Sequence, residues 1–345
     1  MKKMSIIGHF GIGKTLLNGQ TIKTKIISDE LCNQFGNNDV LKIDTHGGIK
    51  SLIKAPFHVF KALRKSKNVI ILPAHNGLRV YAPLLTFFNH FYERKLHYVV
   101  IGGWLPSFLE KQKKLSKSLK AFNYIYVETN TMKTALKQQG FNNIIVMPNC
   151  KKLEILDESE LVYQESEPYK LCTFSRVMKE KGIEDAVNVI KAINQKNGKT
   201  IFTLDIYGQV ESNQTEWFDA LQKSLPKYIK YGGLVPFDRS TEILKNYYAL
   251  LFPTSYEGEG FAGTVIDAYA AGIPVLASDW KYNKEIIIDH YTGLTYKTRQ
   301  FEDFRNKLLW IYEHQKEWNL MKINCLNEAE NYTPEKVIQK ITVRI

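Results

Sequence analysis

Short apolar runs alternate with longer stretches of helical periodicity along the first half of the chain. Each run is followed by polar or glycine-rich residues, and the intervals between runs are long enough for a helix. This alternation is typical of βα units, in which crossover helices join parallel strands. The first half is therefore predicted to hold strands at Met4–Ile7, Val40–Ile43, Val69–Leu72, Tyr98–Ile101, Tyr124–Val127 and Ile144–Met147.

The same pattern restarts after a charged, irregular stretch at residues 151–170. A chain of 345 residues suits two domains of about 150 residues each. We therefore expect an α/β protein with two Rossmann-like domains built on parallel sheets, covering residues 1–165 and 166–329. The second domain is predicted to hold strands at Leu171–Phe174, Phe202–Ile206, Ile229–Tyr231, Leu250–Phe252 and Pro274–Ala277.

Charge and cysteine usage narrow the class of partner and compartment. The net charge of +12 favours anionic partners such as nucleic acid, acidic lipid or a phosphorylated substrate. The four cysteines are far apart in sequence and form no Cys/His cluster, which indicates reduced packing residues in a cytosolic protein. Neither a secretory leader nor an apolar run of about 18 residues is present, so we expect any membrane contact to be peripheral.

The most informative motif lies in the second domain, where a glycine-rich loop joins a buried strand to a helix. Glu259 and Asp267 are two carboxylates eight positions apart across this loop. Gly260 and Gly263 leave backbone N–H groups accessible, and Phe261 and Ala262 lie between them in the loop. The positive end of the helix points at whatever occupies this loop. Glu259 can accept hydrogen bonds from sugar hydroxyls. The loop therefore predicts a site for a phosphorylated, hydroxyl-rich ligand.

This motif resembles the E-x7-E signature of retaining glycosyltransferases of family four, which have the two-domain GT-B fold. The second acid of that signature is usually Glu, and Asp267 is one methylene shorter. The resemblance implies that Asp267 contacts the ribose of the donor, and this interpretation is favoured over the alternative of an acid that only stabilises a helix start. The family's last helix crosses back onto the first domain, and residues 330–345, with Thr333-Pro334 opening a helix, match it.

Two basic residues match a further segment of that family. Phe174-Ser-Arg176 followed by Lys179-Glu-Lys181-Gly182 resembles its R-x4-K-G segment, in which Arg and Lys hold the donor diphosphate. Arg176 and Lys181 are therefore expected to be catalytic, together with Glu259. An Arg offers a fork to phosphate oxygens and a Lys a movable point charge. Gly208 and Leu234 follow two further strands and are expected near the nucleobase.

The N-terminal loop gives the main competing interpretation. Residues Gly8–Thr15 fit G-x4-G-K-T after a strand, the pattern that cradles nucleotide phosphates in P-loop proteins. However, Asn18-Gly19 interrupts the helix that a P-loop needs, and the strand at Val69–Leu72 is followed by Pro73 where an Asp for magnesium is wanted. The resemblance instead implies that the loop approaches the donor phosphate through Gly11 and Gly13. Alternatively, these glycines have a purely conformational role and only allow the loop to adopt positive φ.

The acceptor side carries weaker signals. His46, His75 and Trp104 each follow a predicted strand of the first domain and are candidates for acceptor contact, although a histidine at such a place is more often structural. Five lysines at positions 111–120 interleave with Leu115, Leu119 and Phe122, as in a basic amphipathic helix on an anionic membrane. An ordinary solvated helix face fits that stretch equally well.

The sequence thus predicts a retaining glycosyltransferase that moves a hexose from a nucleotide diphosphate sugar, UDP rather than GDP, to a glycan or lipid-linked acceptor. The resemblance places it in capsule, O-antigen or exopolysaccharide biosynthesis, in the cytoplasm or on the inner face of its membrane. No metal and no further cofactor are expected, and nucleic acid is not expected as a partner. The alternatives are a P-loop NTPase or kinase using Gly8–Thr15, and a non-catalytic protein that binds polyanions.

Overall fold

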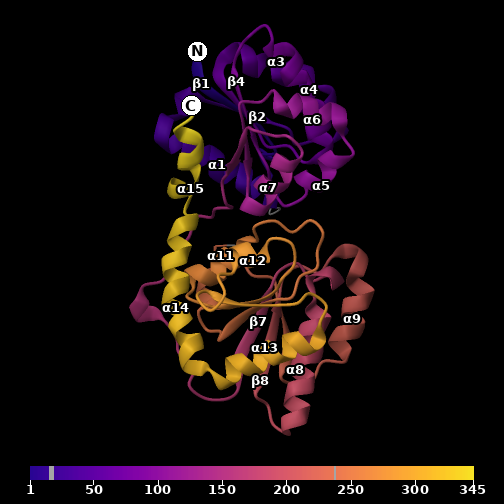
Figure 1. The fold of residues 1–345 in the computed structure, drawn as a ribbon, viewed down its shortest axis with the longest axis vertical. Coiled ribbons are helices and arrows are strands. Elements are labelled where there is room, and N and C mark those ends of the chain that lie inside the picture. The colour runs from indigo at the N-terminus through magenta and orange to yellow at the C-terminus, as the bar shows by residue number, and fades with distance from the viewer. Residues whose placement is uncertain (15–18, 237) are drawn as a thin grey trace. The chain divides into compact units, whose positions relative to one another are not determined.

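The chain forms two compact units in a computed structural model, which describes residues 1–14, 19–236 and 238–345. Unit 1 holds Met1–Lys152 and Tyr332–Ile345, and unit 2 holds Leu153–Asn331. Residues 153–165, assigned to the first domain from sequence, belong to unit 2, where Leu156 N donates to Ala270 O at 3.0 Å. Both units are α/β structures with one sheet each (Figure 1).

Unit 1 is built on a parallel sheet of six strands in the order β2-β1-β3-β4-β5-β6. All six predicted strands are present, and the largest shift is in the fourth, which begins three residues earlier than expected and ends two residues earlier, at Val99. The inner strands are almost wholly buried, because helices cover both faces of a parallel sheet. The bounds are β1 Lys2–Gly8, β2 Val40–Asp44, β3 Ser66–Ile71, β4 Lys95–Val99, β5 Tyr124–Val127 and β6 Ile144–Val146.

The helices of unit 1 include the final segment of the chain. α15 opens at Pro334, as the sequence predicts, and packs against α1. Val337, Ile338 and Ile341 of α15 share a buried cluster with Ile27 and Leu31 of α1. The bounds are α1 Gly19–Phe35, α2 Ile49–Ile53, α3 Ala55–Lys65, α4 His75–Asn89, α5 Leu105–Glu110, α6 Lys113–Lys120, α7 Asn130–Gln138 and α15 Pro334–Thr342.

Unit 2 repeats this design with the strand order β12-β11-β10-β7-β8-β9. The sequence predicts five of these strands but not β12 (Gly293–Tyr296), because four residues that begin with Gly carry little periodic signal. The other bounds are β7 Tyr169–Phe174, β8 Phe202–Tyr207, β9 Ile229–Gly233, β10 Ala249–Phe252 and β11 Val275–Ser278. The helices are α8 Ile183–Asn197, α9 Thr215–Lys223, α10 Ser240–Leu244, α11 Gly263–Ala270, α12 Asn283–Ile286, α13 Phe301–Glu313 and α14 Gln315–Ala329.

Each sheet has a point where the chain reverses its direction of strand addition. In unit 2 the chain runs from β7 outward through β8 and β9, then returns to the other side of β7 with β10. In unit 1 the same reversal separates β1 from β3. Ligands of open α/β sheets bind at the carboxyl ends of the strands at such switch points, because the loops there diverge and leave a crevice.

The predicted fold class, two Rossmann-like domains with parallel sheets, is confirmed. Within the part of the chain that the structure describes, no helix is both long enough and apolar enough to cross a bilayer.

Candidate active site

The loops after β7 and β10 touch at the switch point of unit 2. Gly182, which precedes α8, has φ 68°, and a Cβ built on it would lie 2.1 Å from Pro253 O at the end of β10. Only glycine permits this approach of the two backbones. The approach places the short helix Lys179–Lys181 directly beside the loop that carries Glu259.

Lys181 and Glu259 form a buried ion pair. Lys181 Nζ lies 2.5 Å from Glu259 Oε2, and each side chain is 9% exposed. Thr254 Oγ1 donates to the same carboxylate oxygen at 2.8 Å. The ammonium also lies over the rings of Phe252 and Tyr256, at 5.4 and 5.3 Å from their centroids. The fold therefore brings together two of the three predicted catalytic residues, from segments 78 positions apart.

Arg176 lies on the other side of Tyr256 and is half exposed. Its guanidinium carbon is 5.3 Å from the Tyr256 ring centroid, and Nη1 donates to Glu211 Oε2 at 2.7 Å. The ring thus contacts both Lys181 and Arg176. Contact with one aromatic ring holds the two cations near each other, although each also pairs with a carboxylate of its own. This pair of positive charges suits a ligand with two phosphate groups.

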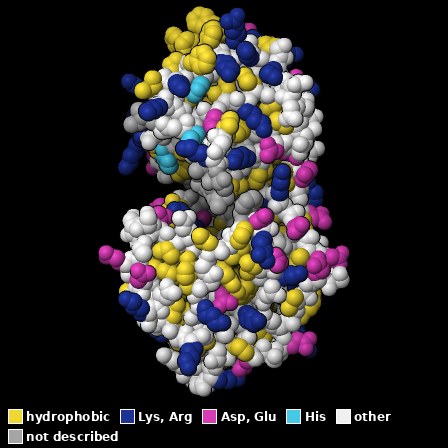
Figure 2. Space-filling model, turned by 180° about the vertical axis from the view of Figure 1, so that it is seen from behind, with side chains coloured by type: hydrophobic (Ala, Val, Ile, Leu, Met, Phe, Trp, Pro, Cys, Tyr) yellow, Lys and Arg dark blue, Asp and Glu magenta, His cyan; other side chains and the backbone are white. Residues whose placement is uncertain are grey.

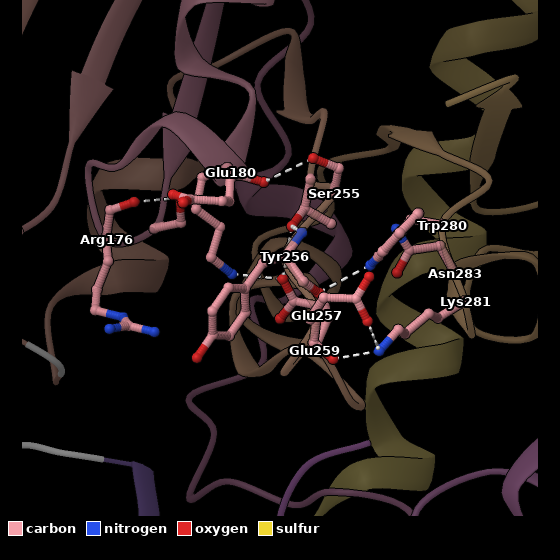
Figure 3. Close-up of polar contacts among 12 residues, drawn as sticks. Arg176, Glu180, Ser255, Tyr256, Glu257, Glu259, Trp280, Lys281 and Asn283 are labelled. Atoms are coloured by element: carbon pink, nitrogen blue, oxygen red, sulfur yellow. Dashed lines mark hydrogen bonds and ion pairs between the residues drawn. The ribbon is translucent and has the colours of Figure 1, made fainter. Parts of the chain in front are cut away.

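The loop from Ser255 to Glu257 is fixed from both sides (Figure 3). Ser255 N donates to Glu180 O at 2.7 Å. On the other side, Trp280 Nε1 donates to Tyr256 O at 2.8 Å, and Lys281 pairs with Glu257 through the carboxylate at 2.8 Å and through the carbonyl. These contacts leave little freedom to the backbone that leads to Glu259.

The start of α11 follows at once. Gly260, Phe261 and Ala262 are buried, and the helix begins at Gly263, so its first N–H groups have no partner within the helix. The Thr264 hydroxyl is buried and has no hydrogen-bond partner among the described residues. Asp267 lies one turn further along α11 and is also buried.

These groups together can bind an anion and a polyol. Arg176, Lys181 and the amides at the start of α11 supply positive charge and donors, whereas Glu259 accepts hydrogen bonds. Among the residues that the structure describes, no group of three or more His, Cys, Asp or Glu could hold a metal ion.

Comparison with protein families gives a match for the part of the chain that holds this site. Residues 158–325 match the family model described as "Glycosyl transferases group 1". This segment, just under half of the chain, is similar to group 1 glycosyltransferases. It contains Arg176, Lys181, Glu259 and the start of α11.

Individual relatives are distant. An uncharacterised glycosyltransferase of Methanocaldococcus jannaschii is 27% identical over 201 residues, 56% of this chain and 48% of that protein. The GtfA subunit of a UDP-N-acetylglucosamine–peptide N-acetylglucosaminyltransferase of Streptococcus parasanguinis is 26% identical over 63% of this chain and 44% of its own. The chain thus spans about half the length of these two relatives. An uncharacterised 41.2 kDa protein in the cps region of Klebsiella pneumoniae is 22% identical over 92% of this chain and 91% of its own.

Solved structures confirm the GT-B fold. A sucrose-phosphate synthase of Thermosynechococcus elongatus superposes with a TM-score of 0.77 at 12% identity, covering 100% of this chain and 98% of that one. HepE of Anabaena, solved in complex with UDP, has a TM-score of 0.74 at 13% identity. The superposition covers 100% of this chain and 99% of HepE. Identities this low establish the shared fold alone.

Two further donor candidates of unit 2 lie at the carboxyl ends of its β8 and β9 strands. Gly208 has φ 134°, and a Cβ there would lie 1.7 Å from Ser175 O, so the backbone approach of the β7 and β8 loops already requires glycine. Leu234 is 68% exposed. Both stay predictions as contacts of a nucleobase.

The N-terminal loop of unit 1 does not have the arrangement of a phosphate cradle. Its backbone N–H groups at Phe10, Gly11 and Ile12 donate to the carboxylate of Asp44 at 2.9–3.2 Å. Burial opposes the ionisation of Asp44, but these bonds and one from His46 N outweigh it and lower its pKa. A protein carboxylate thus occupies the donors that a nucleotide phosphate would need. Thr15, the last residue of the P-loop pattern, lies outside the described residues.

The two glycines proposed for donor contact therefore differ. The Gly11 N–H is already taken by Asp44. Gly13 has φ 79°, and a Cβ built on it would meet no atom of the described residues within 4 Å. Gly13 is the freer of the two to meet a ligand, and both assignments stay predictions.

A cavity of about 380 Å³ lies at the switch point of unit 1, next to the acceptor candidates. His9, which follows β1, and His75, which opens α4, line it together with Thr45, Asn76 and Tyr81. His46 lies behind His9, with its Nδ1 3.0 Å from His9 Nε2, while His9 Nδ1 is 2.7 Å from Thr21 Oγ1. Trp104 lies against His75, with ring centroids 3.8 Å apart. Of the three predicted residues, His75 thus lines the cavity, whereas His46 and Trp104 each contact a histidine that lines it.

The basic segment at 111–122 has a buried apolar side. Leu115, Leu119 and Phe122 are at most 5% exposed, because α6 packs on α4 and α5. Its lysines therefore lie on a solvated face of an ordinary helix, and no apolar stripe is left there for a membrane.

Sequence reasoning missed Tyr256, Thr254, His9 and Asp44. For His9 and Asp44 the available signal was position, since both stand at the carboxyl end of a strand next to the switch point. Nothing in the sequence marks Tyr256 as the ring shared by Arg176 and Lys181, because that contact joins two segments far apart in the chain.

Proposed function

We propose that the chain transfers a hexose from a UDP-sugar to a glycan or lipid-linked acceptor, with retention of the anomeric configuration. The observation that carries this proposal is the buried Lys181–Glu259 pair at the switch point of the segment similar to group 1 glycosyltransferases. Structural neighbours solved with UDP and with UDP-glucose support UDP as the nucleotide. The similarity to a Klebsiella protein of the cps region supports a role in surface polysaccharide biosynthesis in the cytoplasm.

The donor diphosphate would lie between Arg176 and Lys181 on one side and the start of α11 on the other. Arg176 is half exposed and can turn from Glu211 toward a phosphate. The amides of Phe261, Ala262 and Gly263 face the helix terminus, where the dipole favours negative charge. The buried Thr264 hydroxyl supplies a further donor. Asp267, one turn further on, would accept from the ribose hydroxyls.

In the transfer itself, the bond between the sugar C1 and the β-phosphate oxygen breaks, and a bond from C1 to the acceptor oxygen forms. The departing phosphate takes the acceptor's proton, so the reaction needs neither a covalent enzyme intermediate nor a metal. Arg176 and Lys181 stabilise the charge that grows on the diphosphate, and Glu259 orients the sugar through its hydroxyls. Well-placed donors of this kind each lower the activation barrier by about 3 kcal/mol.

The cavity of unit 1 is the proposed acceptor site. Burial lowers the pKa of His9, with His46 acting in the same direction, and burial together with Arg79 lowers the pKa of His75. These imidazoles are therefore neutral at pH 7 and can both donate and accept hydrogen bonds. With Thr45, Asn76 and the ring of Trp104 they suit an uncharged sugar hydroxyl. His46 supports His9 from behind.

A thermal-shift comparison of UDP, GDP and ADP tests the nucleotide, because a ligand that binds only the folded state raises the melting temperature. We expect UDP to give the largest shift. The cognate sugar is then found by following slow hydrolysis of UDP-glucose, UDP-galactose and UDP-N-acetylglucosamine without added metal. If none of the three nucleotides shifts the melting temperature and no sugar nucleotide is cleaved, the proposal is wrong.

A further inference from the structure

Unit 1 exposes five large apolar side chains on α2, α3 and the end of α4. Ile53, Phe57, Phe87 and Phe91 are 74, 64, 65 and 71% exposed, and Phe60 is 43% exposed. Isolated exposed apolar residues are common, but several phenylalanines on adjoining elements need an explanation. We call these five residues the phenylalanine patch.

The patch is one surface. Phe57 and Phe60 are three residues apart on α3 and so lie on the same face of that helix. The ring of Phe60 meets Tyr92, just after α4, edge to face with centroids 6.2 Å apart. Phe87 and Phe91 are in turn 6.4 Å apart. α3 also packs directly on α4. The exposed rings therefore belong to a continuous region that joins the two helices.

The region around the patch is strongly basic. Residues 45–109 contain a single acid, Glu93, against nine basic residues: Lys50, Lys54, Lys61, Arg64, Lys65, Lys67, Arg79, Arg94 and Lys95. Arg64 lies over the Phe60 ring, with its guanidinium carbon 6.0 Å from the centroid. Figure 2 shows a cluster of hydrophobic side chains at the top of unit 1, with Lys and Arg around it. Apolar rings are thus surrounded by positive charge.

We propose that the phenylalanine patch docks unit 1 onto an anionic lipid bilayer. Phenyl rings inserted at the level of the headgroups, with Lys and Arg around them, combine apolar burial with attraction to acidic lipids. A second copy of the chain fits poorly, because two such patches would bring like charges together. The site differs from the basic helix expected from sequence, whose apolar side is buried.

The position of the patch agrees with a membrane-borne acceptor. α2 links the patch to the cavity of unit 1, since Leu52 lines the cavity and the next residue, Ile53, belongs to the patch. The bilayer surface would therefore lie beside the proposed acceptor site. Docking itself does not depend on the proposed reaction, because it needs neither a nucleotide nor an acceptor.

Sedimentation with vesicles tests the proposal on the full chain without any nucleotide. We expect binding to phosphatidylcholine vesicles that contain about 30% phosphatidylglycerol, weak binding to phosphatidylcholine alone, and loss of binding as salt rises. The double variant Phe57→Ser/Phe91→Ser should bind at least tenfold more weakly. Lys54→Glu/Arg64→Glu should lower binding by at least about 25-fold, at about fivefold for each of the two basic residues lost.

Matched controls come from other surfaces. Leu320 on α14 is 67% exposed, so Leu320→Ser removes a comparable apolar group outside the patch. Lys316→Glu/Lys340→Glu changes the net charge by the same amount on α14 and α15. Both controls should bind vesicles as the original chain does. UDP binding measured on every variant separates this test from that of the donor site.

Three outcomes would overturn the proposal. The chain does not bind the acidic vesicles; or the patch variants bind as well as the controls do; or sedimentation velocity shows a dimer that Phe57→Ser/Phe91→Ser dissociates. The last result would assign the patch to a contact between copies.

Discussion

Lys181 Nζ lies 2.5 Å from Glu259 Oε2, and the two side chains are equally buried beneath Tyr256. The pair joins the loops after two adjacent central strands, so it contributes both to the site and to the stability of unit 2. Removing one partner of a buried pair leaves an uncompensated charge, whereas removing both does not.

This relationship predicts a strongly non-additive double-mutant cycle. Lys181→Met and Glu259→Gln should each lower the free energy of unfolding of unit 2 by about 3 kcal/mol, and Lys181→Met/Glu259→Gln by much less than the sum. Denaturant unfolding measures all three. The exposed pair Arg239–Glu242 is the control, where the same exchanges should cost less than about 1 kcal/mol. Additive losses at 181 and 259 would show that the pair is not coupled.

Arg176→Ala should weaken UDP binding by about tenfold to a hundredfold, because one charge-assisted contact to the diphosphate is lost. Titration calorimetry with UDP measures the loss. Arg239→Ala removes another arginine of unit 2 that pairs with a glutamate, and it should leave UDP binding unchanged. An unaltered affinity in Arg176→Ala would remove that residue from the donor site.

His97 predicts a pH dependence of the stability of unit 1. It is fully buried between Tyr126 and Asn68, and burial, with Lys95 and Arg344 acting in the same direction, lowers its pKa from 6.5 to about 3. Between these values the unfolded chain binds a proton that the folded chain does not, so stability falls as the pH drops below 6.5. The loss from this group should reach about 3 kcal/mol at about pH 4.

Replacing His97 isolates that contribution. His97→Gln should be less stable at pH 7 but show a flatter decline from about pH 6.5 to 4 in urea unfolding. His90→Gln, at an exposed position of the same unit, should keep the slope of the original chain. Equal slopes in the two variants would contradict the assignment.

Lys322 predicts that a substitution can stabilise unit 2. It is buried in α14 with Nζ 3.5 Å from Gly272 O, and burial lowers its pKa from 10.5 to about 8. The ammonium is therefore charged at pH 7, and burying this charge lowers the stability of unit 2. Between pH 8 and 10.5 the folded state releases the proton that the unfolded state still holds, so stability rises with pH. Lys322→Met should raise the free energy of unfolding by about 2 kcal/mol at pH 7. In this variant the free energy of unfolding should not rise between pH 8 and 10.5.

The exposed Lys316 of the same helix provides the comparison. Lys316→Met should change the unfolding free energy by less than about 0.5 kcal/mol. A destabilised Lys322→Met would mean that the ammonium makes a net favourable contact.

Local signals carried much of the fold and of the donor site. The alternation of apolar runs with helical stretches predicted eleven of the twelve strands, because burial on both faces leaves a continuous apolar segment that needs no partner to be recognised. Glu259 and Lys181 were predicted from short motifs for the same reason. Each motif is a loop that can be recognised from neighbouring residues alone. β12 was missed because an edge strand of four residues has too little pattern to stand out.

The sequence by itself determined the order of the βα units, the glycine-rich loops and the excess of positive charge. Only the tertiary structure decided which of these meet. Tyr256 contacts both Arg176 and Lys181, and Asp44 fills the loop that resembles a phosphate cradle. Phenylalanines near α3 and α4 are exposed, whereas the apolar side of the lysine-rich α6 is buried. The physical reason is the range of the interactions. Periodicity and loop chemistry act within a few residues, whereas these contacts depend on strand order and helix packing, which bring together segments far apart in the chain.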